Sequence, residues 1–337
     1  MNRLLVTGGA GFIGSNFVRM VLSEHPDCFL VNLDNLTYAG NLENLAGFEN
    51  HPNHQFIKGD ICDGVLIEKI IDDNRINVII NFAAESHVDR SITEPKVFIE
   101  TNVAGTLTLL EAARDKKLDR FVQISTDEVY GALGPEGKFT EQTPLSPNSP
   151  YSASKAAADL LVKAFGHTWG VKYNITRCSN NYGPYQFPEK LIPLMINNAL
   201  NDKELPIYGD GLYVRDWLYV QDHCAAIWKV LTEAPAGKVY NIGGCNEKKN
   251  IEVVQLILNR LGKPHSLIKH VTDRPGHDRR YAIDASKIID ELKWGPSVSF
   301  EEGLDKTIDW YLQNKNWLAN VVSGDYQDYY EQMYGNR

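Results

Sequence analysis

A tyrosine and a lysine four residues apart, Tyr151 and Lys155, are the first candidates for chemistry in this sequence. Residues at this spacing lie on one face of a helix, so the lysine ammonium can sit near the phenol and favour the phenolate. A free phenol titrates near pH ~10, and a tyrosine that must accept a proton from a substrate hydroxyl needs such a neighbour. The pair predicts oxidation of an alcohol, with Tyr151 as the base.

Two adjacent carboxyl groups, Asp127 and Glu128, follow the apolar run at 121–124. They supply an acid and a base side by side, which a plain dehydrogenase does not need, and so they indicate a second chemical step. Each pattern also has a common structural explanation, because most Tyr-x-x-x-Lys pairs are solvated helix faces and most Asp-Glu pairs after a strand are turns. Their combination favours catalysis.

The elements that must position these groups begin at the N-terminus. Residues 3–6 predict a short buried strand, and Gly8, Gly11 and Gly14 predict a tight turn into an amphipathic helix. This order is typical of dinucleotide binding, because glycines let backbone N–H groups approach a pyrophosphate at the positive end of the helix. Asp34 ends a second apolar run 20 residues after Gly14. A carboxylate there binds the adenosine ribose and repels a 2′-phosphate, which favours NAD over NADP.

Strands and helices alternate through the first half of the chain, which predicts an α/β fold with a Rossmann-type, doubly wound parallel sheet. We expect strands at 55–61, 78–82 and 121–125, helices at 98–113, 152–165 and 191–201, and loops at 180–184 and 206–211. The expected domains are an NAD-binding domain over 1–183, with a return segment near 215–245, and a smaller α/β substrate-binding lobe formed mainly by 184–337.

Further residues in this pattern are candidates for binding. Asp60 follows a strand and could meet the adenine amino group, and the small residues that begin at Ala83 let a cofactor approach. Cations in the second half are expected on a diphosphate, because guanidinium groups match phosphate oxygens in pairs. These candidates are Lys190, Arg215 and the run Asp273, Arg274, Pro275, Gly276 and His277.

Composition narrows the class of protein. The chain has 337 residues and a formal net charge of −9 with no basic run, which argues against nucleic acid and anionic membranes as partners. No signal peptide is recognised, and no apolar run approaches the ~20 residues that cross a bilayer, so we expect a cytoplasmic protein. The five cysteines lack CxxC spacing and the nine histidines lack metal-ligand spacing, which predicts reduced thiols and no metal site.

The motifs together carry a resemblance. The glycine turn, Tyr151-x-x-x-Lys155 and Ser125/Thr126 resemble the extended short-chain dehydrogenase/reductase (SDR) superfamily, whose members act on nucleotide sugars. Within it, residues 83–91, 125–131, 178–185 and 273–281 are similar to the dTDP-glucose 4,6-dehydratase family, and the match runs nearly end to end. The adjacent carboxylates are its most specific element, since related epimerases and decarboxylases do not have both. The stretch from Gly131 to Tyr151 is short for the family.

The resemblance implies a lyase that converts dTDP-D-glucose to dTDP-4-keto-6-deoxy-D-glucose and water. Tyr151 would take the C4 hydroxyl proton, assisted by Lys155 and Thr126, while a hydride passes to NAD. Glu128 would then remove the C5 proton as Asp127 protonates the C6 hydroxyl, and the hydride would return to C6. Such a reaction supplies deoxysugars, such as dTDP-rhamnose, for bacterial surface polysaccharides or secondary metabolites.

The resemblance also implies contacts and assembly. The expected NAD site consists of Gly8, Gly11, Phe12, Ile13, Gly14, Asp34, Asn35, Leu36, Thr37, Asp60, Ile61, Phe82, Ala83, Ala84, Glu85, Ser86, Thr101, Tyr151, Lys155 and Asn181. The nucleotide sugar would meet Ser86, Thr126, Asn180, Lys190, Leu191, Pro206, Ile207, Tyr208, Arg215, Asn250, Asp273, Arg274, Pro275, Gly276 and His277, with 206–208 on the thymine. A homodimer would pack through the helices near 100–113 and 152–165.

Two other functions stay open. A nucleotide-sugar epimerase or decarboxylase also uses Tyr151, Lys155 and NAD, but it has no need for Asp127 as an acid at C6. A non-catalytic NAD-binding regulator is the second alternative, and in that class the tyrosine or the lysine is usually lost.

Overall fold

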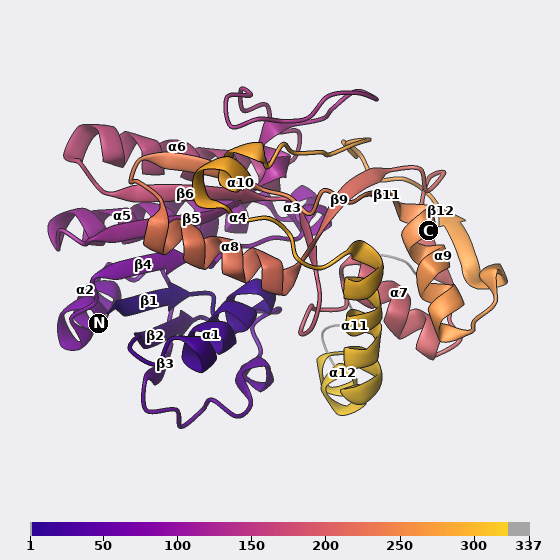
Figure 1. Ribbon diagram of the computed structural model, residues 1–337, viewed down its shortest axis with the longest axis horizontal. Helices are drawn as coiled ribbons and strands as arrows, with labels where there is room; N and C mark the ends of the chain where they lie inside the picture. The colour runs from indigo at the N-terminus through magenta and orange to yellow at the C-terminus, as the bar shows by residue number, and fades with distance from the viewer. Residues whose placement is uncertain (1, 323–337) are drawn as a thin grey trace.

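A seven-stranded parallel sheet forms the centre of the larger domain in the computed structural model, which describes residues 2–322 (Figure 1). Its strand order is β10-β6-β5-β4-β1-β2-β3, and all neighbouring pairs are parallel. The order reverses beside β1, which is the switch point where open α/β sheets bind ligands. The strands are β1 (Arg3–Thr7), β2 (Phe29–Asp34), β3 (His54–Lys58), β4 (Val78–Asn81), β5 (Arg120–Thr126), β6 (Tyr173–Cys178) and β10 (Lys238–Ile242).

Helices cover both faces of this sheet, as the expected Rossmann-type fold requires. On one face α1 (Phe12–Glu24) and α8 (Val220–Glu233) pack their apolar sides on the strands, and on the other face α2 (Gly64–Asn74), α5 (Thr106–Asp115) and α6 (Pro150–Trp169) do so. Short segments follow the strands: α3 (Val88–Thr93), α4 (Pro95–Phe98), α10 (Ser286–Leu292) and 3₁₀ turns at Leu42–Leu45 and Asp127–Tyr130. The predicted fold class is confirmed.

The two longest predicted helices differ at their ends and in their interior. The helix expected at 98–113 begins as α4 and passes through a π-helical segment, Ile99–Gly105, before α5. The helix expected at 152–165 is longer at both ends. It begins at Pro150 because Ser149 caps it through the backbone N–H of Ser152, and it ends at Gly170, which adopts a left-handed φ of 72°. These capping residues fix where Tyr151 and Lys155 stand along the helix.

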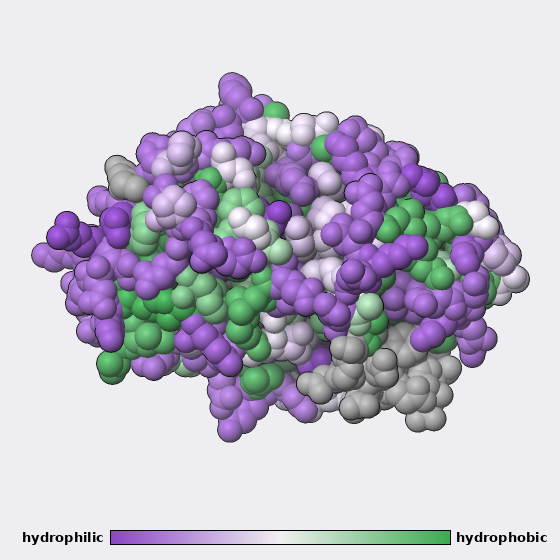
Figure 2. Space-filling model, turned by 90° about the horizontal axis from the view of Figure 1, so that it is seen from below, coloured by the Kyte–Doolittle hydropathy of each residue, from purple (hydrophilic) through white to green (hydrophobic). Residues whose placement is uncertain are grey.

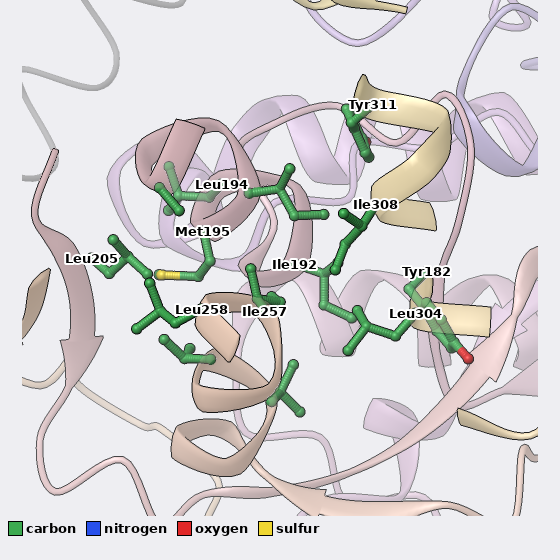
Figure 3. Packing of buried hydrophobic residues seen from close by; sticks show 14 of the residues in the cluster. Tyr182, Ile192, Leu194, Met195, Leu205, Ile257, Leu258, Leu304, Ile308 and Tyr311 are labelled. Carbon is green, nitrogen blue, oxygen red and sulfur yellow. The ribbon is translucent and has the colours of Figure 1, made fainter. Parts of the chain in front are cut away.

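The smaller lobe contains two short sheets and its own core. One sheet has the order β11-β9-β7 and the other pairs β12 with β8. Figure 3 shows how side chains of the helices interdigitate between these sheets, around Met195, Ile257 and Leu304. The elements are β7 (Asn180–Tyr182), β8 (Leu205–Tyr208), β9 (Val214–Tyr219), β11 (Glu247–Lys249), β12 (Ile268–Val271), α7 (Leu191–Leu200), α9 (Asn250–Leu261), α11 (Phe300–Gln313), α12 (Lys315–Val321) and a 3₁₀ turn at His265–Leu267.

Two predicted loops contain strands. Asn180–Tyr182 is β7 and pairs with β9, and Leu205–Tyr208 is β8 and pairs with β12. Both strands are short, and their partners lie more than thirty residues further along the chain. Local sequence patterns favoured turns at both places, because Gly183 and Pro184 follow β7, while β8 contains Pro206 and is followed by Gly209 and Gly211. The prediction of loops over these residues was wrong.

The molecular surface is mostly hydrophilic on the face shown in Figure 2, with apolar patches over the larger domain and the smaller lobe. Among residues 2–322, no helix combines the length and the apolar character that crossing a bilayer demands.

Candidate active site

A cavity of ≈ 360 Å³ lies at the carboxyl ends of the parallel strands. Gly8 follows β1, Asp34 ends β2, Phe82 follows β4, Thr126 ends β5 and Cys178 ends β6, and all of them line it. Segments of the smaller lobe near 186–192 line the same cavity. The switch point of the sheet and the smaller lobe therefore enclose one site.

The glycine turn makes one wall of this cavity. Gly8 has a φ of 70°, and a Cβ at that position would lie 2.6 Å from the backbone nitrogen of Ala83. A Cβ at Gly14 would lie 2.2 Å from the carbonyl oxygen of Gly8. Both positions thus require glycine, and the first turn of α1 is left open to the cavity beside Gly11. This cradle fits a pyrophosphate at a helix N-terminus.

Asp34 has a structural task as well as the predicted binding task. Its Oδ2 accepts a hydrogen bond of 2.9 Å from the N–H of Ala10, and its Oδ1 accepts one of 2.8 Å from the N–H of Leu36. Burial raises the pKa of this carboxyl despite these bonds. The carboxylate thus ties the glycine turn to the loop after β2 while facing the cavity.

The predicted cofactor residues lie together, with one exception. The cavity is lined by Gly8, Gly11, Phe12, Ile13, Gly14, Asp34, Asn35, Thr37, Asp60, Ile61, Phe82, Ala83, Ala84, Glu85, Ser86, Thr101, Tyr151, Lys155 and Asn181. Leu36 is not among the lining residues. It adopts a positive φ of 54° and packs against the core between the sheet and α1.

The tyrosine and the lysine reach the cavity from the first turns of α6. The Lys155 ammonium donates a hydrogen bond of 2.8 Å to the carbonyl oxygen of Ile124 in β5, and burial lowers its pKa. Burial and the Glu128 carboxylate raise the pKa of the Tyr151 phenol well above its usual value, and a hydrogen bond with Thr126 offsets only part of this. The lowering of the phenol pKa that we expected from Lys155 is therefore not seen in this structure, because burial dominates.

The two carboxyl groups stand in different surroundings. Asp127 is 2% exposed and does not line the cavity, whereas Glu128 does. Burial, Glu128 and Asp216 raise the pKa of Asp127 well above its ordinary value. Burial also raises the pKa of Glu128, but the nearby cations, led by Arg274, oppose this rise. The pair thus combines a carboxyl that favours protonation with one held closer to ionisation.

The predicted substrate residues fall into two groups. The cavity is lined by Ser86, Thr126, Asn180, Lys190 and Leu191. The remaining residues lie outside its lining: Pro206, Ile207, Tyr208, Arg215, Asn250, Asp273, Arg274, Pro275, Gly276 and His277. The second group is joined to the first by charge, since Arg274, Arg215 and Lys190 all act on the Glu128 carboxyl.

Internal bonds order the second group. Tyr208 donates a hydrogen bond of 2.8 Å to Asp89, and Arg274 donates one of 2.9 Å to the other oxygen of the same carboxylate. The His277 ring stacks on Tyr213 with centroids 3.8 Å apart. Asp89 is 4% exposed and comes from α3 of the larger domain, so it fixes an arginine of the smaller lobe beside the cavity.

Several residues of the cavity were not predicted. They are Leu33, Ala39, Gly40, Gly59, Ile124, Ser125, Cys178, Ser179, Gln186, Phe187, Glu189, Ile192 and Trp217. Six of these thirteen residues, Glu189 among them, directly adjoin a predicted residue, so proximity in the sequence was an available signal for fewer than half of the set. Glu189 belonged to no motif of its own.

Comparison with known proteins agrees with this geometry. The family model described as GDP-mannose 4,6 dehydratase matches residues 5–307. A curated dTDP-glucose 4,6-dehydratase of Xanthomonas campestris pv. campestris (strain B100) is 57% identical over 341 residues, which cover 96% of this chain and 97% of the relative. The chain belongs to the dTDP-glucose 4,6-dehydratase family. This resemblance, expected from the sequence, is confirmed.

Solved dTDP-glucose 4,6-dehydratases superpose closely. The enzyme of Bacillus anthracis str. Ames in complex with NAD is 53% identical, with a TM-score of 0.90, and covers 95% of this chain and 100% of its own. The enzyme of Streptomyces venezuelae with NAD and TYD bound is 50% identical, with a TM-score of 0.92 and 95% and 99% coverage. A UDP-glucose 4-epimerase of Thermotoga maritima is 30% identical, with a TM-score of 0.87 and 93% and 99% coverage, so the fold extends beyond the dehydratase family.

Proposed function

We propose that this protein is a hydro-lyase that converts dTDP-D-glucose into dTDP-4-keto-6-deoxy-D-glucose and water, with NAD as its cofactor. The observation that carries the proposal is one cavity that brings together the glycine turn, Tyr151, Lys155, Thr126 and Glu128, with Asp127 buried directly behind them. Membership of the dTDP-glucose 4,6-dehydratase family supports the same substrate.

The residues present suit NAD. A Cβ at Gly8 or Gly14 would collide with the chain's own backbone, so these glycines permit the tight turn that brings the N-terminus of α1 to the cavity. Asp34 stands at the end of β2 to accept from ribose hydroxyls. When bound, NAD supplies the hydride acceptor for C4, the hydride donor for C6 and a positive charge beside the phenol. The remaining cavity-lining residues named above would enclose it.

Tyr151 acts first in this proposal. Its phenol oxygen removes the proton from the C4 hydroxyl, so that C4 can be oxidised to a ketone. Because burial and Glu128 raise the pKa of the phenol in the protein alone, the phenolate would depend on the Thr126 hydrogen bond together with the positive charge that bound NAD adds. Lys155 holds a positive charge at the end of β5, where its bond to Ile124 anchors the ammonium. The C4 ketone makes the C5 hydrogen acidic and prepares the elimination.

The adjacent carboxyls perform the second step. Glu128 faces the cavity and removes the C5 proton, while Asp127 gives its proton to the departing C6 hydroxyl, which leaves as water. Burial, Glu128 and Asp216 raise the pKa of Asp127, which favours the protonated carboxyl that this step needs. Glu128 then returns its proton to C5, which restores its carboxylate. Before the next turnover, Asp127 must regain the proton that it gave to the departing water, and Tyr151 must lose the one that it took from the C4 hydroxyl.

The sugar nucleotide would bind across the two lobes. Residues 1–183, with the return segment near 215–245, would hold the cofactor, and 184–337 would mainly hold the nucleotide. Arg215 and Arg274 would meet the diphosphate, and residues 206–208 the thymine. Two arginines suit a diphosphate because each guanidinium can pair with two oxygens.

We further propose a cytoplasmic homodimer that supplies deoxysugars for surface polysaccharides or secondary metabolites. The apolar side chains of Ile99, Leu160 and Trp169 are 51%, 56% and 52% exposed on the helical segments expected at the dimer interface. Exposed apolar groups of this size on adjacent helices are typical of a protein contact. Sedimentation of the purified chain would give the mass of the assembly, and a monomer would contradict the proposal.

Labelled substrate tests the reaction. The purified protein is incubated with dTDP-glucose carrying deuterium at C4, without added NAD, and the product is analysed by mass spectrometry and NMR. A product lighter by one water, with deuterium at C6, is expected. A product of unchanged mass with deuterium at C4 would instead establish an epimerase, which the similarity to the Thermotoga maritima epimerase makes the second candidate.

A further inference from the structure

Three loops from distant parts of the chain meet beside the cavity, and Tyr38 lies between them. Its hydroxyl donates a hydrogen bond of 3.3 Å to Oε1 of Glu189, a residue 151 positions further along the chain. The Arg90 guanidinium lies over the Tyr38 ring at 3.8 Å from its centroid. The Phe187 ring meets Tyr38 edge-on at 6.0 Å. The loop after β2 is thus held from two sides.

Glu189 is the point at which these contacts converge. Its side chain is 2% exposed, with Oε2 lying 4.0 Å from Nε of Arg90 and 4.0 Å from Nε2 of His87. Nζ of Lys190 lies 3.9 Å from Oε1 and also donates a hydrogen bond of 2.9 Å to the carbonyl oxygen of Ser86. Burial raises the pKa of the Glu189 carboxyl to about 7, although Lys190, Arg90 and the Tyr38 hydroxyl favour its ionised form.

These contacts join the two sides of the cavity. Ala39 and Gly40, which follow Tyr38, line the cavity next to the glycine turn, while Glu189 and Lys190 line it from the segment before α7. Arg90, in α3, connects the two. Separating the loops would expose the Tyr38 ring and deprive the buried Glu189 carboxyl of the Tyr38 hydroxyl and of Arg90.

We propose that Tyr38, Arg90 and Glu189 are positioning residues that form a clasp across the cavity and set the rate at which bound NAD is released. The proposal rests on the NAD-dependent function proposed above. In that reaction the same cofactor must remain in place between the oxidation at C4 and the reduction at C6. A clasp built from one ring, one guanidinium and one carboxyl group supplies this retention.

The experiment measures exchange of NAD. Holoenzyme is mixed with excess isotopically labelled NAD, separated rapidly by gel filtration at successive times, and the bound NAD is analysed by mass spectrometry. Tyr38→Phe removes the hydroxyl that bonds to Glu189, Glu189→Gln removes the negative charge, and Tyr38→Ala also removes the ring beneath Arg90. Thermal melting of each variant reports whether it is folded.

The chain offers a matched control. Tyr240 donates a hydrogen bond of 2.7 Å to Glu291, and Nζ of Lys287 lies 4.7 Å from the centroid of the Tyr240 ring. This group has the same kinds of contact as the clasp, with a lysine in place of the arginine and an exposed carboxyl in place of a buried one, and none of its members lines the cavity. Tyr240→Phe and Glu291→Gln therefore test whether loss of such a contact anywhere in the protein changes exchange.

The clasp predicts about 3- to 10-fold faster exchange for Tyr38→Phe and Glu189→Gln, from the loss of one polar contact. Tyr38→Ala should exchange about 5- to 30-fold faster, and adding Glu189→Gln to it should have little further effect. Both control variants should exchange like the wild type.

Wild-type exchange rates in Tyr38→Phe and Tyr38→Ala would overturn the clasp, as would equal acceleration in the control variants. If Glu189→Gln fails to fold, the two Tyr38 variants decide the question. Exchange needs no turnover, so a protein that exchanges NAD at a clasp-dependent rate but converts no dTDP-glucose would refute the proposed function alone. Wild-type protein that binds no NAD would overturn both.

Discussion

A methyl group at Gly14 would collide with the turn that precedes α1. The Cβ of alanine would lie 2.2 Å from the carbonyl oxygen of Gly8 and 2.9 Å from its carbonyl carbon. These are backbone atoms that no side-chain rotation can remove, and carbon contacts are comfortable only beyond ~3.5 Å. Gly14→Ala must therefore displace the helix from the turn by about 1 Å.

Two effects of known size should follow. Overpacking of this kind costs about 1–3 kcal/mol of folding free energy. The displaced helix would also lose good hydrogen-bond geometry with a bound pyrophosphate, and charge-assisted bonds contribute about 1.5–3 kcal/mol, so NAD should bind about 10- to 100-fold more weakly. Urea unfolding measures the first effect, and calorimetric titration of the cofactor-free protein with NAD measures the second.

Gly64→Ala is the matched control, because Gly64 also stands at the start of a helix, α2. A Cβ there meets only Cγ2 of Thr108, at 3.6 Å, which is an ordinary contact. The variant should keep its NAD affinity and gain up to about 1 kcal/mol of stability, since alanine favours helix more than glycine does. Equal NAD affinity in Gly14→Ala and the wild type would refute the assignment of the glycine turn to the pyrophosphate.

Four further variants have expected outcomes. Tyr151→Phe should abolish turnover, whereas Glu128→Gln should slow water loss more than C4 oxidation in single-turnover mass spectrometry, and normal turnover of Glu128→Gln would exclude Glu128 as the base. Burial lowers the pKa of His223 to about 3, so the unfolded chain binds a proton at this residue at a higher pH than the folded protein does. The free energy of unfolding should therefore fall as the pH drops from ~6.5 towards that value, and urea unfolding should show a shallower fall in His223→Asn. Asp159→Asn would strip the fully buried Arg177 of its 2.8 Å ion pair and should cost about 3–5 kcal/mol in the same assay, and a loss below 1 kcal/mol would contradict the burial of that charge.

The glycine turn and the catalytic helix were predictable because their signals are local. Gly8, Gly14 and Asp34 stand at spacings that a single strand-turn-helix unit dictates. Tyr151 and Lys155 share a helix face because they are four residues apart. The boundaries of that helix were less predictable, since they depend on capping by Ser149 and on the left-handed Gly170.

Contacts between distant segments were beyond such patterns. β7 and β8 were predicted as loops because each is stabilised by a strand far along the chain, not by its own composition. The contact between Tyr38 and Glu189 was not predicted for the same reason, because these residues are 151 positions apart and neither belongs to a recognised motif. Asp89 likewise gains importance only where the fold brings it to Arg274.

The adjacent carboxyls of Asp127 and Glu128 show what the sequence predicts and what only the fold decides. Their neighbouring positions predict mutual repulsion and thus one raised pKa, but they do not say which carboxyl keeps the proton. The fold decides this by surrounding them unequally. Burial raises the pKa of Asp127, and the neighbouring carboxyls of Glu128 and Asp216 raise it further. Burial also raises the pKa of Glu128, but the positive charges of Arg274, Arg215 and Lys190 oppose that rise.

The unequal surroundings carry a consequence for the order of events. The three cations that favour ionised Glu128 are also residues expected to meet the sugar nucleotide. A bound diphosphate would draw on the same positive charge, so the Glu128 carboxylate would become a stronger base once substrate is in place. The diphosphate of the substrate would thus favour removal of the C5 proton. In the free enzyme, the cations hold Glu128 closer to ionisation, so its carboxylate is a weaker base there.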